Sequence, residues 1–155
     1  MSSTLPLFTS LRQLIAAIPA GRDDWCLIGS AAAFLSGIDL QPDDIDVVGT
    51  KATIEALHAN LGKGTSTLAS EDSKLFHSMP FVRVQVEGGR PIELMGDLKI
   101  CIDGAWQHLV ITTRQRVITP AGILYVPSLK EQVSIFERFG RPKDLQKADL
   151  LRRYL

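Results

Sequence analysis

Apolar residues follow two different periods along the chain, and these periods separate the expected helices from the expected strands. Helical spacing between capping and breaking residues predicts helices over residues 6–18, 30–35, 50–61, 129–139 and 142–155. Short apolar runs or polar–apolar alternation predict strands over residues 25–28, 44–48, 81–87 and 91–95. Two stretches rich in β-branched residues, 106–113 and 117–126, predict further strands at one edge of the sheet. Residues 63–80 show little pattern, and there we expect a loop with a short strand near Thr67 to Ala69.

Residues at the expected helix ends have the chemistry that these positions require. Thr50 can cap the third helix, and Gly62 can end it. Ser128 and Glu131 have the spacing of a capping box, with Ser at the N-cap and Glu at N3. Pro142 suits the first turn of the last helix. We therefore expect helices to begin or end at these residues.

The strands on either side of residues 88–90 are expected to form a hairpin, whose register depends on the loop length. A two-residue loop would place Glu93 opposite Val84, whereas a three-residue loop places Glu93 opposite Gln85. The longer loop puts the apolar residues of both strands on one face, while a slip by one residue would mix the two faces. We therefore predict the longer loop, with Arg83 and Gln85 on the face of Glu93 as candidate contacts to an acceptor or a base.

Length and composition indicate an ordinary globular protein. The chain has 155 residues, enough for one domain, in which we expect residues 1–127 to form a sheet with its helices and residues 128–155 to form C-terminal helices. Lys and Arg number 17 and so do Asp and Glu, so no overall positive field would attract nucleic acid or an anionic membrane. The C-terminal residues are locally basic, which we interpret as a solvated helix face.

The sequence predicts a cytoplasmic protein with reduced cysteines. Arg12 and Gln13 interrupt the apolar residues near the N-terminus and no cationic segment precedes them, so we expect neither a signal peptide nor a membrane span. Cys26 and Cys101 lack the spacing of metal ligands and are expected to be free thiols. The three histidines show no metal-ligand spacing either, and we assign them no chemistry.

Candidate chemistry lies in two acidic residues of the expected second strand. Asp44 and Asp46 are two residues apart, so their side chains project to one side while Ile45 faces the core. Adjacent carboxylates repel each other, and Mg²⁺ is commonly held by one or two carboxylates together with substrate phosphates. Glu93 also stands between apolar residues, on a strand that could lie beside this one. Three carboxylates on one face could bind two ions roughly 4 Å apart, as in phosphoryl-type transfer.

Gly29 and Ser30 form a second candidate element at the junction of a buried strand and a helix. Glycine lets the backbone approach a phosphate, the helix N-terminus offers free N–H groups, and the Ser hydroxyl adds a donor. Such a turn could hold a phosphate beside the metal that the carboxylates would bind.

These residues together resemble the nucleotidyltransferase superfamily related to DNA polymerase beta. The family pattern is an apolar residue followed by Gly-Gly or Gly-Ser, an acidic-apolar-acidic triplet on the next strand, and a later acidic residue between apolar ones. Residues 28–30 (Ile-Gly-Ser), 44–46 (Asp-Ile-Asp) and 92–94 (Ile-Glu-Leu) match it in order and context. The run 29–37 and the segments 126–130 and 141–145 are similar to the branches that modify small molecules or act as toxins, including antibiotic nucleotidyltransferases.

The resemblance implies an α+β fold, with a mixed sheet, flanking helices and a short helical C-terminal segment. It implies Mg²⁺-dependent transfer of a nucleoside monophosphate from a nucleoside triphosphate to a hydroxyl acceptor. Asp44, Asp46 and Glu93 would be the catalytic residues and ligands of a two-ion site. Gly29, Ser30 and Lys130 would bind the nucleotide. The acceptor is a small molecule or an RNA end, with the neutral charge favouring the small molecule, and a homodimer partner could complete its site.

Two alternatives stand beside this hypothesis. Asp44, Asp46, Gly49 and Glu55 have the spacing of a calcium-binding EF-hand loop, but Val48 occupies a position where such a loop needs a polar residue. A nucleotide-binding or antitoxin-like regulatory module with little turnover could also keep this fold. Retention of all three acids favours the enzyme.

Overall fold

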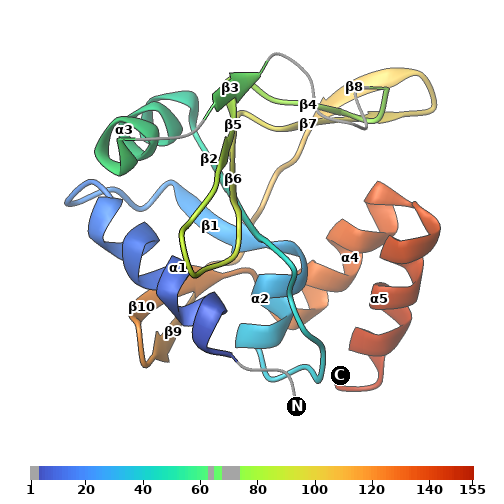
Figure 1. Cartoon of the computed structure of the whole chain (residues 1–155). Coiled ribbons are helices and arrows are strands. Elements are labelled where there is room, and N and C mark those ends of the chain that lie inside the picture. The colour runs from blue at the N-terminus through green and yellow to red at the C-terminus, as the bar shows by residue number, and fades with distance from the viewer. Residues whose placement is uncertain (1–3, 63–64, 68–73) are drawn as a thin grey trace.

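A five-stranded mixed sheet forms the centre of the protein. The computed structural model describes residues 4–62, 65–67 and 74–155. The strands lie in the order β1-β2-β6-β5-β3 (Figure 1), with β2 and β6 parallel and the other neighbours antiparallel. Their bounds are β1 (Trp25–Ile28), β2 (Ile45–Gly49), β3 (Thr65–Thr67), β5 (Phe81–Val84) and β6 (Ile92–Gly96).

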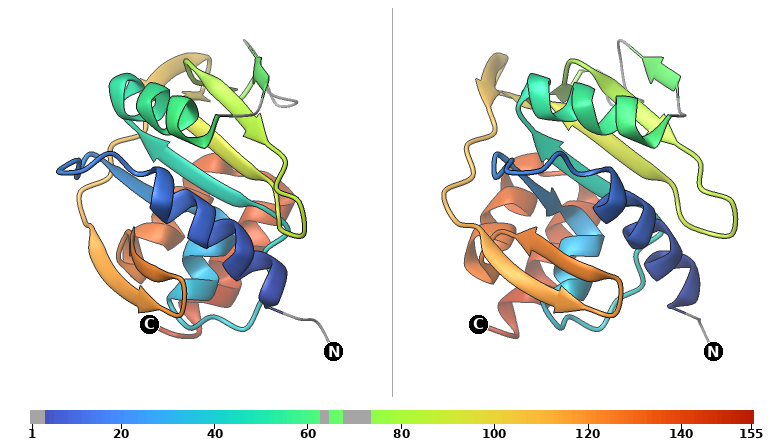
Figure 2. Two further views of the ribbon diagram at one scale, coloured as in Figure 1. Left: turned by 60° about the vertical axis from the view of Figure 1, so that its left-hand side comes forward. Right: turned by 90° about the vertical axis from the view of Figure 1, so that its left-hand side faces the viewer.

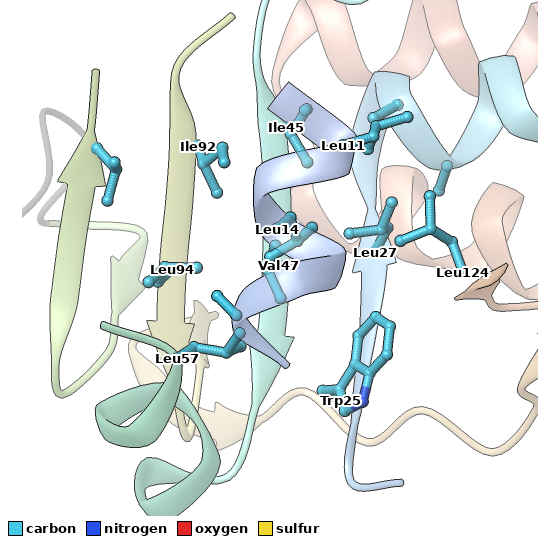
Figure 3. Close-up of a cluster of buried hydrophobic side chains, with 14 of the residues drawn as sticks. Leu11, Leu14, Trp25, Leu27, Ile45, Val47, Leu57, Ile92, Leu94 and Leu124 are labelled. Atoms are coloured by element: carbon cyan, nitrogen blue, oxygen red, sulfur yellow. The ribbon is translucent and has the colours of Figure 1, made fainter. Parts of the chain in front are cut away.

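One face of this sheet carries the main hydrophobic core. Alternation along β2 and β6 turns Ile45, Val47, Ile92 and Leu94 to the same side, where all four are fully buried (Figure 3). Helices α1 (Leu5–Ala17) and α3 (Lys51–Leu61) cover this face (Figure 2). The helical spacing of apolar residues in both segments therefore predicted the helices and their buried sides correctly.

The C-terminal helices pack together with the short helix that follows β1. α4 (Leu129–Phe139) and α5 (Pro142–Arg152) share a buried cluster with α2 (Gly29–Leu35), formed by Ala33, Val133, Phe136, Ala148 and Leu151. α4 also sends Ile135 and Phe139 into a third cluster on the second face of the sheet. The predicted helical C-terminal segment is confirmed, and it packs against α2, the helix that begins at Gly29.

The helix caps follow the predicted chemistry with one exception. The Thr50 hydroxyl accepts from the Thr53 N–H (3.3 Å), and Gly62 ends α3 in the left-handed conformation. Ser128 caps α4 by accepting from the Glu131 N–H (3.2 Å). The reciprocal half of the predicted capping box is wrong, because the Glu131 carboxylate accepts hydrogen bonds from the residues at 112 and 113.

The predicted edge strands exist only in part and lie outside the five-stranded sheet. β8 (Ala105–His108) pairs with β7 (Lys99–Ile102), which pairs with β4 (Phe76–His77), while β9 (Gln115–Thr119) and β10 (Gly122–Val126) form a separate hairpin. The prediction of a strand continuing to residue 113 is wrong. The backbone N–H groups of Thr112 and Thr113 donate to the Glu131 carboxylate (2.7 and 2.8 Å), so they are not available to a β-ladder.

The short strand expected near Thr67 to Ala69 is observed as β3, which ends at Thr67. Ala69 lies outside the described residues.

The predicted hairpin register is wrong by two residues, although the assignment of faces is correct. Glu93 lies opposite Arg83 and not opposite Gln85, so the connection runs from residue 85 to residue 91. Ser10 of α1 explains the wider loop, since its hydroxyl donates to the Arg90 carbonyl oxygen (2.6 Å) and accepts from the Arg90 N–H (2.7 Å). An even shift keeps the valines of β5 on the core side.

None of the described helices combines the length and the apolar character that crossing a bilayer requires.

We expect Glu131→Ala to lower the free energy of unfolding by about 1–3 kcal/mol, because it removes the acceptor for both hydroxyls and both N–H groups of Thr112 and Thr113. Burial alone would raise the pKa of Glu131, but the hydrogen bonds from Thr113 and Thr112 outweigh it and lower that pKa. The stabilisation should therefore be present above the unfolded-state pKa and be lost as the pH falls through the folded-state pKa.

Thermal unfolding across pH measures this effect. Glu137→Ala on the same helix is the matched control, since its ion pair with Arg152 is exposed and should contribute at most about 1 kcal/mol. Equal losses for both variants would contradict the anchoring role of Glu131.

Candidate functional site

A row of directly paired residues crosses the second face of the sheet. Asp46 on β2 lies opposite Ile28 on β1 and beside Glu93 on β6, and Glu93 lies opposite Arg83 on β5. Paired residues on neighbouring strands point to the same side. The strand pairing that buries Ile45 and Leu94 therefore also places both carboxylates on the opposite face.

Asp44, the residue immediately before β2, adds a third carboxylate to Asp46 and Glu93. The Ile45 N–H donates to the Pro91 carbonyl oxygen (2.9 Å), which holds the entry of β2 beside the start of β6. One carboxylate oxygen each from Asp44, Asp46 and Glu93 lies within 4.8 Å of the other two, and all three side chains are half-buried. The three predicted acids are thus brought together.

Gly29 approaches this cluster so closely that a side chain there would force Asp46 to shift. Its φ is +71°, and a Cβ at this position would lie 2.8 Å from Oδ2 of Asp46. Left-handed backbone already disfavours other residues, and their Cβ would clash with the carboxylate unless Asp46 moved. Ser30 follows as the second residue of α2 and is half-buried. The predicted Gly-Ser turn therefore lies directly against one of the predicted acids.

The electrostatics of the cluster favour the uptake of positive charge. Burial raises the pKa of Asp46 well above its usual value, and the nearby carboxylates of Asp44 and Glu93 raise it further. Burial and then Asp44 raise the pKa of Glu93, while Arg83 opposes this rise in part. Several carboxylate oxygens at one point fit the preference of Mg²⁺ for oxygen ligands. The residues present therefore fit the metal that the sequence implied.

Two basic side chains lie at the edge of the cluster: Arg83, which the sequence predicted on the face of Glu93, and Lys147, which it did not assign to the site. The Arg83 guanidinium forms an ion pair with Glu93 through Nη1 and Oε1. Lys147 of α5 lies with Nζ 5.8 Å from the centre of the Phe136 ring, and its positive charge partly opposes the rise in the pKa of Asp46. Lys130, the predicted nucleotide-binding lysine, is exposed as the second residue of α4.

A sequence signal for Lys147 existed in the helical period. Asp144, Ala148 and Leu151 are the buried residues of α5, and Lys147 lies one turn from two of them, on the side that packs inward. We predicted that the basic C-terminal residues form a solvated helix face. Arg152 and Arg153 are exposed as expected, whereas Lys147 is half-buried and its charge acts on Asp46.

The calcium alternative does not fit the structure. Glu55, which would be the last ligand of an EF-hand loop, lies on α3 and forms an ion pair with Lys51 (3.8 Å). The three-acid cluster takes its third member from β6.

A cavity of about 350 Å³ lies at the other end of β1 and β2, away from the acids. Trp25, Gly49, Thr50 and Asp97 are among its lining residues, and it contains none of the three carboxylates. The candidate chemistry is thus separate from this cavity.

Comparison with known proteins yields fold relatives. No family model and no curated protein sequence matches the chain. A crystal structure of a Thermotoga maritima protein assigned by inference as a nucleotidyltransferase is similar, with a TM-score of 0.75, 20% identity and coverage of 96% of this chain and 91% of that one. The solution structure of the antibiotic-resistance factor ANT(2'')-Ia is similar with a TM-score of 0.50, 13% identity and coverage of 92% and 81%. At these identities the likeness concerns the fold, and the chain therefore has the α+β nucleotidyltransferase fold.

Proposed function

We propose that the protein is a Mg²⁺-dependent nucleotidyltransferase that moves a nucleoside monophosphate from a nucleoside triphosphate to a hydroxyl acceptor and releases pyrophosphate. The convergence of Asp44, Asp46 and Glu93 beside the turn at Gly29 is the observation that carries this proposal. The nucleotidyltransferase fold supports it.

Each of these residues has a part in the proposed reaction. Asp44 and Asp46 would hold two Mg²⁺ ions, and Glu93 would be a ligand of one of them. Gly29, Ser30 and Lys130 would bind the triphosphate through backbone N–H, hydroxyl and ammonium groups. When bound, the ions would neutralise the charge on the phosphates and on the attacking and leaving oxygens.

Proton transfer falls to Glu93 in this proposal. The acceptor oxygen forms a bond to the α-phosphorus, the bond from that phosphorus to the oxygen bridging it to the β-phosphate breaks, and pyrophosphate departs. Glu93 takes the proton of the acceptor hydroxyl. The place of Glu93 in the cluster, within 4.8 Å of the two acids that would hold the ions, supports this role.

A small-molecule acceptor is favoured over an RNA end. An RNA substrate is usually held by many phosphate contacts from Lys and Arg, and the chain has no net positive charge. One structure of similar fold is an antibiotic-resistance factor, which supports the same choice.

Replacement of the metal-binding acids should abolish transfer. We expect Asp44→Ala and Asp46→Ala each to lower the rate of pyrophosphate release by about a hundredfold or more, since each removes charge that positions the metal. The assay incubates the protein with Mg²⁺, each labelled nucleoside triphosphate and pools of hydroxylated metabolites or RNA. Asp43→Ala is the matched control, because Asp43 is the exposed neighbour of Asp44 and lies outside the cluster.

Undiminished transfer by a variant that carries both Asp44→Ala and Asp46→Ala would show that the proposed mechanism is wrong. Tight nucleotide binding by the unaltered protein without pyrophosphate release would instead identify a regulatory binding module.

The metal-free protein should gain stability when Asp46 loses its charge. Because the folded-state pKa of Asp46 is raised, the folded state binds more protons than the unfolded state between the two pKa values, and stability falls as the pH rises through that range. We expect Asp46→Asn to raise the melting temperature of the metal-free protein at neutral pH by roughly 2–8 °C.

Added Mg²⁺ should then raise the melting temperature of the unaltered protein and leave that of Asp46→Asn nearly unchanged. A lower melting temperature for the metal-free variant would contradict the electrostatic account of the cluster.

Gly29→Ala separates the effect of steric conflict from that of backbone strain. The new Cβ would meet Asp46 at 2.8 Å, so we expect at least a tenfold loss of transfer in addition to a stability loss of about 1–3 kcal/mol. Gly37→Ala is the control, since Gly37 has a φ of +93° but a Cβ added there would have nothing within 4 Å. Equal loss of transfer in both variants, measured under conditions where both are folded, would argue against the contact with Asp46.

A further inference from the structure

Arg83 forms an ion pair with Glu93, the third acid of the cluster. The proposed function gives this ion pair no role. Its position opposite Glu93 across the β5–β6 pairing brings the guanidinium to the carboxylate, and Nη1 donates to Oε1. Glu93 is the more enclosed partner, with 20% of its side chain exposed against 44% for Arg83. Most of the exposed surface of this pair therefore belongs to the arginine, which has room to move away.

The ion pair involves only one of the three acids, Glu93. Among the residues that the structure describes, Asp44 and Asp46 have no ion pair with a basic side chain, and Lys147 acts on Asp46 without forming one. A divalent cation therefore meets two carboxylates that form no ion pair with a basic side chain and one, Glu93, that already has a counter-ion. An ionised carboxylate can accept hydrogen bonds on both oxygens, but a fixed positive charge beside it repels a second cation.

We infer that Arg83 is a positioning residue that competes with the divalent cation for Glu93. In the metal-free protein it neutralises Glu93 and lets the strand pairing hold three acids together. Metal binding displaces it, so Glu93 becomes a ligand only when a cation has already been bound by Asp44 and Asp46. The released guanidinium stays on the same face and becomes a donor for an anionic group such as a phosphate. This inference rests on the proposed metal-dependent function.

The position of Arg83 makes the competition testable without turnover. Removing the arginine should have two effects of opposite sign: the metal-free protein loses an ion pair, while the metal site loses a competitor. If the role of Arg83 were purely structural, its removal would lower stability without strengthening metal binding. The two readouts therefore separate the two roles.

The experiment measures Mn²⁺ affinity by electron paramagnetic resonance, and melting temperature without metal, in the unaltered protein and in Arg83→Gln, Arg83→Lys and Arg12→Gln. We expect Arg83→Gln to bind Mn²⁺ about three- to tenfold more tightly and to melt at a lower temperature without metal. Arg83→Lys, which keeps the charge, should have an affinity close to that of the unaltered protein. Arg12→Gln changes the net charge equally on α1, which packs on the opposite face of the sheet, and should alter neither readout.

The outcomes are distinct. Mn²⁺ affinity that is unchanged or weaker in Arg83→Gln, with normal binding by the unaltered protein, would overturn the role of Arg83 and leave the proposed function intact. An equal gain in Arg12→Gln would also overturn it, because net charge would then be the cause. Absence of Mn²⁺ binding in both the unaltered protein and Arg83→Gln would overturn the metal site and this inference together.

Discussion

The parallel pairing of β2 with β6 is the constraint on which both the core and the candidate site depend. The register that sets Val47 beside Leu94 in the core also sets Asp46 beside Glu93 on the other face. A slip of one residue would turn the acids into the apolar core and the apolar residues out of it. Burial of the hydrophobic face therefore provides the free energy that keeps mutually repelling carboxylates together.

The strand–helix junction at Gly29 depends on the same pairing through β1. Asp46 lies opposite Ile28, so the residue after Ile28 must turn away next to the carboxylate. Glycine meets both requirements, because it tolerates the left-handed backbone and leaves the space that Oδ2 occupies. The Gly-Ser turn and the acidic pair are thus parts of one geometric arrangement, although Asp44 lies fourteen positions beyond Ser30 in the sequence.

Local patterns in the sequence predicted the helices, the strands that form the sheet and the three acids that converge. These features depend on side-chain periodicity and capping, which act over a few residues. Long-range contacts explain the errors. Ser10 widens the hairpin loop from eighty residues away, and Glu131 binds the backbone of Thr112 and Thr113, where a strand was expected. Neither partner could be recognised from the residues beside the affected segment.

The sequence predicted the basic side chains around the acids only in part, for a related reason. The hairpin prediction placed Arg83 on the face of Glu93 but opposite a different residue. The shift of two residues in register brings the guanidinium directly opposite the Glu93 carboxylate. Lys147 belongs to a helix whose packing onto α2 and α4 could not be derived from its own sequence. The three acids lie on or beside two neighbouring strands. The basic side chain of Lys147, by contrast, comes from a helix close to the C-terminus. The charge balance of the site therefore depends on how the C-terminal helices pack, which makes this packing part of the site's chemistry as well as of the fold.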